Sequence, residues 1–154
     1  MEKIKSYRLE LDAERHPALV AEDKWEYDQK KFSSPQEIVD LLNLTVNLKN
    51  QAEEYVYMLA LDTRYNLKAL FEVSHGASAY TPCDPKEIYT RALLSGANRI
   101  VVVHNHPTGD PSPSEVDTKT AERLKATGEV VGIPLKDFII IGDGTYYSFK
   151  ENME

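Results

Sequence analysis

Short apolar runs along the chain predict β-strands. The run at 54–62, EYVYMLALD, is apolar and aromatic with charge at both ends, which is typical of a buried central strand. Turn-forming residues follow it, and the apolar run at 67–74 returns, so the two segments predict a β-hairpin. Three further strands are predicted from β-branched or apolar runs, the last of them after a Gly142-Asp143-Gly144 turn: 99–103, 138–141 and 145–149.

Three helices are predicted from capping residues that precede apolar positions at helical spacing. Ser34 as the N-cap, Pro35 as the first helical residue and Glu37 as the reciprocal capping partner predict a helix that runs to about residue 44. The segment to Ala52 is expected to continue it in less regular form. The second helix starts at Asp84-Pro85-Lys86-Glu87, places Ile88, Ala92 and Leu93 on one face, and ends at Gly96; the third runs from Ser114 to about Thr127.

The order of these elements predicts an α/β fold, with a mixed β-sheet flanked by helices. We divide the chain into an N-terminal extension, residues 1–33, and a domain, residues 34–154. In the extension, Tyr7, Leu9 and Leu11 alternate with polar residues and predict an edge strand. The polar stretch at 12–34 has no period and is interpreted as a linker with room for one short strand.

Composition and charge restrict the class of protein. A chain of 154 residues has the size of one domain, and its net charge of −7 argues against a nucleic-acid partner. One cysteine, Cys83, excludes a disulfide within the chain and favours a reduced, cytoplasmic setting. We find neither an apolar signal core nor a run of about 20 apolar residues, so no membrane association is expected.

A possible metal site follows the strand that ends at Val103. His104 and His106 are two residues apart, so on an extended chain both imidazoles point to one side. Asp117 lies in the first turn of the helix that Ser114 opens. Two imidazoles and one carboxylate suit Zn²⁺ and leave a fourth position for water. Taken singly, these residues also fit a strand-end histidine and an ordinary helix cap.

The spacing His104-x-His106, seven residues, Ser114, two residues, Asp117 resembles the JAMM (MPN⁺) metalloprotease signature. The flanking sequence, HNHPTGDPSPS, resembles the RadC-like branch of the JAB domain. The resemblance covers about residues 34–150, including the helix start at Asp84 and the hairpin at Gly142. It implies the JAB/MPN (cytidine-deaminase-like) architecture.

The resemblance also implies a zinc-dependent metallopeptidase or isopeptidase. Zinc would be held by His104, His106 and Asp117, and a glutamate would activate the zinc-bound water. In RadC-like members that glutamate opens the strand ending in Leu-Asp, which here indicates Glu54. Glu53 would point to the opposite face, and Glu72 in the next strand is a third candidate. Ser114 would donate to the oxyanion.

Other residues near the motif have two interpretations each. Asn105 points away from the two histidines and either braces the loop or is solvated. Cys83 precedes a helix N-terminus, which can activate a thiol, but an inert residue is favoured. His75 lies either at the mouth of the site or at a strand end. Trp25, with Tyr27, is expected to anchor the extension onto the domain.

A hydrolase of this kind is expected to act on a peptide or protein substrate. Two other functions remain as alternatives. Many MPN domains are catalytically silent scaffolds that bind partners without metal. A DNA-repair-associated factor is the other, but it would require a basic groove, and the chain has no room for the N-terminal helix-hairpin-helix module of longer RadC-like proteins. A homodimer is compatible with the sequence.

Overall fold

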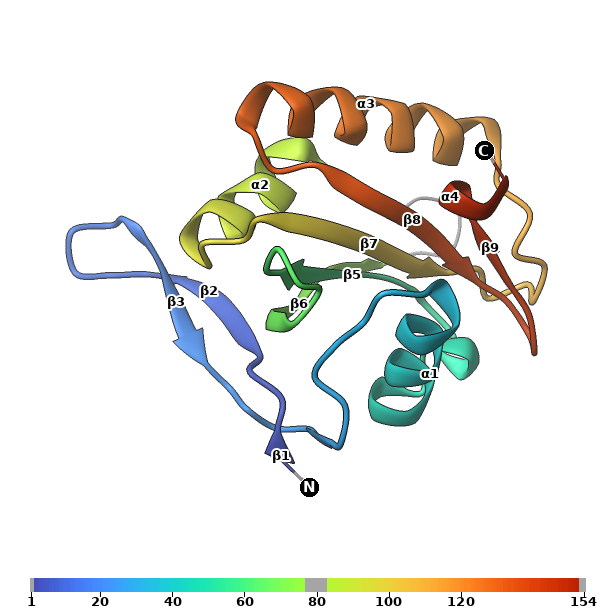
Figure 1. Ribbon diagram of the computed structural model, residues 1–154, viewed down its shortest axis with the longest axis horizontal. Coiled ribbons are helices and arrows are strands. Elements are labelled where there is room, and N and C mark those ends of the chain that lie inside the picture. Colours follow the sequence, from blue (N-terminus) through green and yellow to red (C-terminus); the bar gives the residue numbers. More distant parts are fainter. Residues whose placement is uncertain (1, 77–82, 153–154) are drawn as a thin grey trace.

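A five-stranded sheet in the order β6-β5-β7-β8-β9 forms the centre of the computed structural model, which describes residues 2–76 and 83–152 (Figure 1). β7 and β8 are parallel, and the other neighbours are antiparallel, so the sheet is mixed. Its strands are β5 (Glu54–Leu61), β6 (Leu67–Gly76), β7 (Arg99–Asn105), β8 (Leu135–Ile141) and β9 (Tyr146–Ser148).

Helices cover both faces of this sheet (Figure 1). α1 packs on one face, and α2 and α3 pack on the other. None of the helices within the described ranges is long and apolar enough to cross a membrane. The helices are α1 (Pro35–Val46), α2 (Pro85–Leu94), α3 (Glu115–Val131), α4 (Phe149–Asn152) and the 3₁₀ turn η1 (Leu48–Asn50).

Two hydrophobic cores result, one on each side of the sheet. Along β5, Val56 and Met58 point toward α2 and α3, whereas Tyr57 and Leu59 point toward α1. A strand that is buried on both faces has no polar side, which explains the continuous apolar run in its sequence. The predicted α/β fold with a mixed sheet flanked by helices is confirmed.

The predicted helix starts are confirmed. Ser34 and Ser114 each form a capping box, with Glu37 and Asp117 respectively, and the Asp84 carboxylate accepts from the Lys86 amide. Two details were wrong. Leu93 is 60% exposed, because the buried face of α2 runs through Ile88, Tyr89 and Ala92.

The end of α3 was the second error. The helix passes Gly128, where a Cβ would meet the Tyr89 hydroxyl at 2.5 Å and the Ile133 carbonyl oxygen at 2.6 Å. It ends instead at Gly132, whose φ of 84° provides the left-handed C-cap. Gly128 therefore serves close packing within the helix, and the stop signal lies four residues further on.

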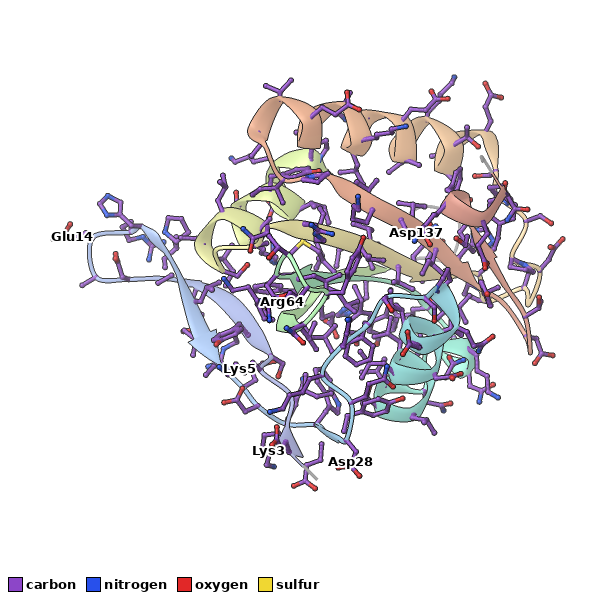
Figure 2. All side chains as sticks on the ribbon, viewed as in Figure 1. Lys3, Lys5, Glu14, Asp28, Arg64 and Asp137 are labelled. Carbon is purple, nitrogen blue, oxygen red and sulfur yellow. The ribbon has the colours of Figure 1, made fainter. Side chains whose placement is uncertain are left out.

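The N-terminal arm, residues 2–31, has more structure than a linker. β2 (Tyr7–Leu11) forms as predicted, but its partner is β3 (Pro17–Ala21), and β1 (Glu2–Lys3) pairs with β4 (Glu26–Tyr27). The β2–β3 hairpin projects from the domain, with Glu14 at its tip (Figure 2). The arm joins the edge of the central sheet at β6, where the Leu70 amide donates to the Lys5 carbonyl at 2.8 Å.

Candidate metal site

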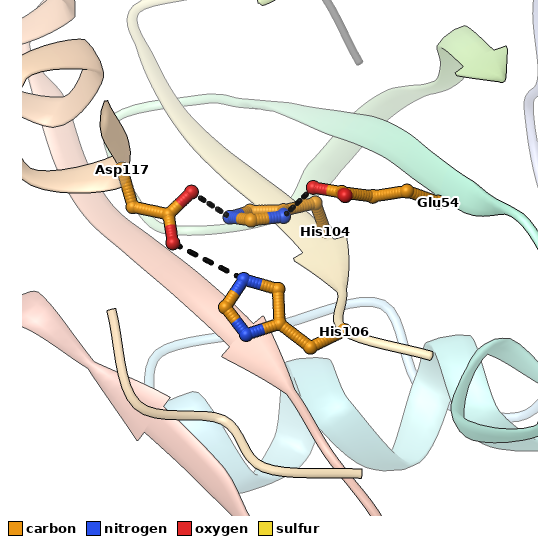
Figure 3. A group of neighbouring side chains, drawn as sticks. All are labelled: Glu54, His104, His106 and Asp117. Carbon is orange, nitrogen blue, oxygen red and sulfur yellow. Dashed lines mark hydrogen bonds and ion pairs between the residues drawn. The ribbon is translucent and has the colours of Figure 1, made fainter. Parts of the chain in front are cut away.

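Four side chains converge at one end of the central strands: Glu54, His104, His106 and Asp117 (Figure 3). One nitrogen or oxygen atom from each lies within 4.8 Å of the others. The register between β5 and β7 explains why Glu54 and His104 lie close together. His104 pairs with Val56 across β5 and β7, and Glu54, two residues before Val56, lies on the same face of the sheet.

His104 uses its two ring nitrogens differently. Its Nδ1 lies 2.8 Å from Glu54 Oε1, an arrangement that keeps the proton on Nδ1. Its Nε2 lies 3.4 Å from Asp117 Oδ1 and has no hydrogen-bond partner among the described residues, although the side chain is only 4% exposed. A buried nitrogen with a free lone pair beside a carboxylate fits a metal ligand.

His106 turns the corresponding nitrogen toward the same carboxylate. Its Nε2 lies 3.1 Å from Asp117 Oδ2, and its Nδ1 lies 2.9 Å from the carbonyl oxygen of Asp110. The ring is therefore held from behind by a carbonyl, as metal-binding histidines commonly are. The hydrogen bond with Asp117 raises the pKa of His106 against the effect of burial.

Asp117 is the charged centre of the group. Burial acts to raise its pKa, but the hydrogen bond from His106 and the hydrogen bonds from Ser114 act in the opposite direction and contribute to outweighing burial. The pKa of Asp117 is thereby lowered to about 2. Asp117 is a carboxylate at neutral pH, which is the form that binds a cation.

Ser114 positions Asp117. Its amide donates to Asp117 Oδ2 at 2.8 Å, and its Oγ accepts from the Asp117 amide at 3.1 Å. These two bonds form the capping box of α3, the ordinary structural role considered for the pair. An accepting hydroxyl still carries its own proton, so Ser114 keeps the capacity to donate. Its oxyanion role stays a prediction.

Of the three candidate glutamates, only Glu54 lies in the group with His104 and His106. Glu53 is exposed, and its backbone carbonyl accepts from Asn105 at 3.0 Å. Glu72 accepts from the Tyr57 hydroxyl at 3.3 Å and lies 3.2 Å from His75 Nδ1. His75 thus lies near the end of β6, stacked on a tyrosine, and takes no part in the four-residue group.

Sequence reasoning missed one neighbour of His104 and left two other residues open. The Phe138 ring lies 5.2 Å from the imidazole, between centroids, and closes one side of the site. The apolar run at 138–141 predicted a strand but gave no signal for which face Phe138 occupies. Asn105 is 1% exposed and is therefore not solvated. Cys83 has its pKa raised to about 12, by burial and then by Asp84 and Asp117, so its thiol stays neutral.

Known proteins with similar sequences share this domain. The family model of the RadC-like JAB domain matches residues 32–154. A UPF0758 protein of Pelobacter propionicus is 39% identical over 121 residues, which is 79% of this chain and 52% of the relative. A UPF0758 protein of Methanosarcina mazei is 36% identical over 126 residues, 82% of this chain and 54% of the relative.

The chain spans about half the length of these curated relatives. The matched region contains all four clustered residues, the sheet and its covering helices. The predicted resemblance is thus confirmed: this chain belongs to the RadC-like JAB domain family.

Proposed function

We propose that this protein is a zinc-dependent hydrolase. The observation that carries the proposal is the buried Nε2 of His104, which faces Asp117 without a hydrogen-bond partner among the described residues. The Nε2 of His106 faces the other oxygen of the same carboxylate. Two imidazole nitrogens and one carboxylate are a donor set of catalytic zinc sites, which keep a position for water.

Zinc held by these residues would activate a water molecule and polarise a carbonyl oxygen of the substrate. Glu54 would take the proton of the attacking water. Its carboxylate oxygen lies within 4.8 Å of a ligand atom from each of the other three residues, a span that one water bridges. The contact between Glu54 and His104 Nδ1 also orients the imidazole, so Glu54 would serve both purposes.

Cleavage of an amide requires a proton for the leaving nitrogen. The water oxygen forms the new bond to carbon, the carbon–nitrogen bond breaks, and Glu54 passes its proton to the amine. Ser114 Oγ would donate a hydrogen bond to the carbonyl oxygen as negative charge develops on it. We propose a peptide or isopeptide bond as the substrate, on the strength of the JAMM-type motif in this family.

Zinc content tests the metal. The purified protein is expected to contain about one zinc per chain, and His106→Ala is expected to lose it because two donors bind far more weakly than three. Elemental analysis after dialysis measures both. His16→Ala, which removes an exposed histidine of the β2–β3 loop, is the matched control and is expected to keep its zinc.

Hydrolysis of a peptide library tests the reaction. Glu54→Gln is expected to keep the fold and to lose about 10²–10⁴-fold in rate, because the amide cannot carry the proton. A wild-type protein that takes up no zinc, even when zinc is supplied, contradicts the proposal and favours a scaffold role. Full activity of Glu54→Gln would exclude Glu54 as the base.

A further inference from the structure

Asn105 lies between the two histidines on β7, with its side chain on the opposite face of the sheet. Its Oδ1 accepts from the Tyr55 amide at 2.7 Å. Its Nδ2 donates to the Glu53 carbonyl at 3.0 Å and to the Gln51 carbonyl at 3.4 Å. The bonded groups on either side, the carbonyl of residue 53 and the amide of residue 55, flank Glu54.

We propose that Asn105 is the positioning residue of Glu54, an inference that rests on the proposed function. The β5–β7 pairing stops at Val56 opposite His104, two residues after Glu54. Beyond that point the carboxamide of Asn105 takes the place of a backbone peptide group, with one acceptor and two donors. It thereby extends the hydrogen-bonded ladder to the backbone on both sides of Glu54.

Without this bridge, the start of β5 would be held on one side only, by β6, where Glu54 pairs with Gly76 and Tyr55 pairs with His75. Ala52 and Glu53 are exposed, and strand ends with solvent-exposed hydrogen bonds open readily. Glu54 must nevertheless keep its Oε1 at 2.8 Å from His104 Nδ1. Because Asn105 follows His104 directly in β7, one strand fixes both partners of that contact. The Asn105 side chain holds the backbone on both sides of Glu54, and the residue before Asn105 is His104, which carries the imidazole.

The chemistry of the bridge requires an amide. An aspartate would keep the acceptor for the Tyr55 amide but would place an oxygen against the carbonyls of Glu53 and Gln51. A serine would not span both groups. Among the described residues, the side chain of Asn105 hydrogen-bonds to the backbone of Gln51, Glu53 and Tyr55 and to none of the four clustered side chains, so these bonds act on the site through the backbone that flanks Glu54.

A double-mutant cycle on zinc affinity tests the proposal. Residues that hydrogen-bond to a metal ligand typically contribute 10–100-fold to metal affinity, and Glu54→Ala is expected to lose that much. Asn105→Ala is expected to lose about three- to tenfold, and the double variant to bind no more weakly than Glu54→Ala alone, because both changes remove one interaction. Competition with a chromogenic chelator measures the four affinities.

Tyr89→Phe is the matched control, because it removes a buried hydroxyl that joins α2 to α3 by donating to the Leu124 carbonyl at 3.0 Å, and this bond involves neither β5 nor β7. Its zinc affinity is expected to stay within about twofold of wild type. Losses that multiply in the double variant, or no loss in Asn105→Ala, would overturn the proposal. If the alanine variant does not fold, Asn105→Ser enters the same cycle.

A crystal structure of Asn105→Ala tests the position of Glu54 without zinc or substrate. The carboxylate of Glu54 is expected beyond hydrogen-bond distance of His104 Nδ1, with the sheet otherwise intact. A retained 2.8 Å contact would refute the positioning role, whatever the outcome for zinc and hydrolysis. Conversely, a displaced Glu54 in a protein that hydrolyses no peptide would uphold the inference and count against the proposed function.

Discussion

The charge of the four-residue group depends on where its protons lie. Glu54 favours a proton on His104 Nδ1, which leaves Nε2 as an electron-pair donor. The hydrogen bond between His106 and Asp117 raises the pKa of the histidine, while the carboxylate keeps a pKa of about 2. In the absence of metal, a proton on His106 Nε2 therefore occupies the side of the ring that a cation would need.

Zinc affinity is accordingly expected to depend on pH. Below the raised pKa of His106, each zinc ion must displace one proton, so affinity falls about tenfold for each pH unit of acidification. Above that pKa the ring is neutral and this dependence disappears. Chelator competition from about pH 5.5 to about pH 8.5 measures the profile, a range that spans ordinary histidine titration.

His16→Ala is the control for this profile, because His16 is exposed and lies in the β2–β3 loop. It is expected to give the wild-type curve. A flat curve in the wild-type protein would show that no proton leaves His106 on binding.

Local spacing made part of this site predictable. On a strand, side chains repeat every two residues, which places His104 and His106 on one side. On a helix they repeat about every three and a half residues, which places Ser114 and Asp117 on one face. The contact between Glu54 and His104 joins residues 50 positions apart. It depends on the register between β5 and β7, next to an irregularity in the β5–β6 pairing at Val56/Tyr57. Local spacing does not determine strand register. The sequence could therefore not show which ring nitrogen of His104 contacts Glu54.

At the scale of elements, the turn between β8 and β9 supports the loop that follows His106. The Asp143 amide donates to the Gly109 carbonyl at 2.8 Å, and the His106 amide donates to the Ile141 carbonyl at 2.9 Å. A Cβ at Gly142 would collide with the Gly109 carbonyl oxygen and with Pro111 Cδ at 2.8 Å. The same loop carries the Asp110 carbonyl that orients His106.

Gly142→Ala is therefore expected to move the loop and weaken zinc binding by about tenfold, as loss of a contact that orients a metal ligand does. The stability cost is expected at about 1–3 kcal/mol, the usual range for overpacking. Chelator competition and urea unfolding measure the two effects.

Gly144→Ala is the control in the same turn. Gly144 has a φ of 72°, and a Cβ at this position would meet no described atom within 4 Å. The change therefore costs about 1–2 kcal/mol of backbone strain without touching the loop. It is expected to keep zinc affinity. Equal losses of affinity in both variants would mean that the turn acts through stability alone.

On the scale of the whole molecule, one sheet joins two cores. Met58 faces the α2 and α3 side and Leu59 faces α1, and both are fully buried in β5. The apolar runs predicted the strands but could not show which helix covers which face. The pairing of Pro17–Ala21 with β2 was missed for a similar reason, since its pattern is short and weakly periodic.

Met58→Ala and Leu59→Ala are each expected to lower the free energy of unfolding by about 2–5 kcal/mol, the cost of a cavity in a packed core. Because both cores share β5, urea unfolding is expected to stay a single transition in both variants. Leu44→Ala, at a position that is 76% exposed, is expected to change stability by less than about 0.5 kcal/mol. A separate early transition in either core variant would show that the cores unfold independently.

The arm and the four-residue group lie toward different ends of β6. The arm meets the strand at Leu70, whereas Glu54 pairs with Gly76, six residues and about 20 Å further along. A tether or fluorophore joined ahead of Glu2 would hold the molecule by the arm. Immobilised in that way, the protein would present the Glu54 end of its sheet away from the support.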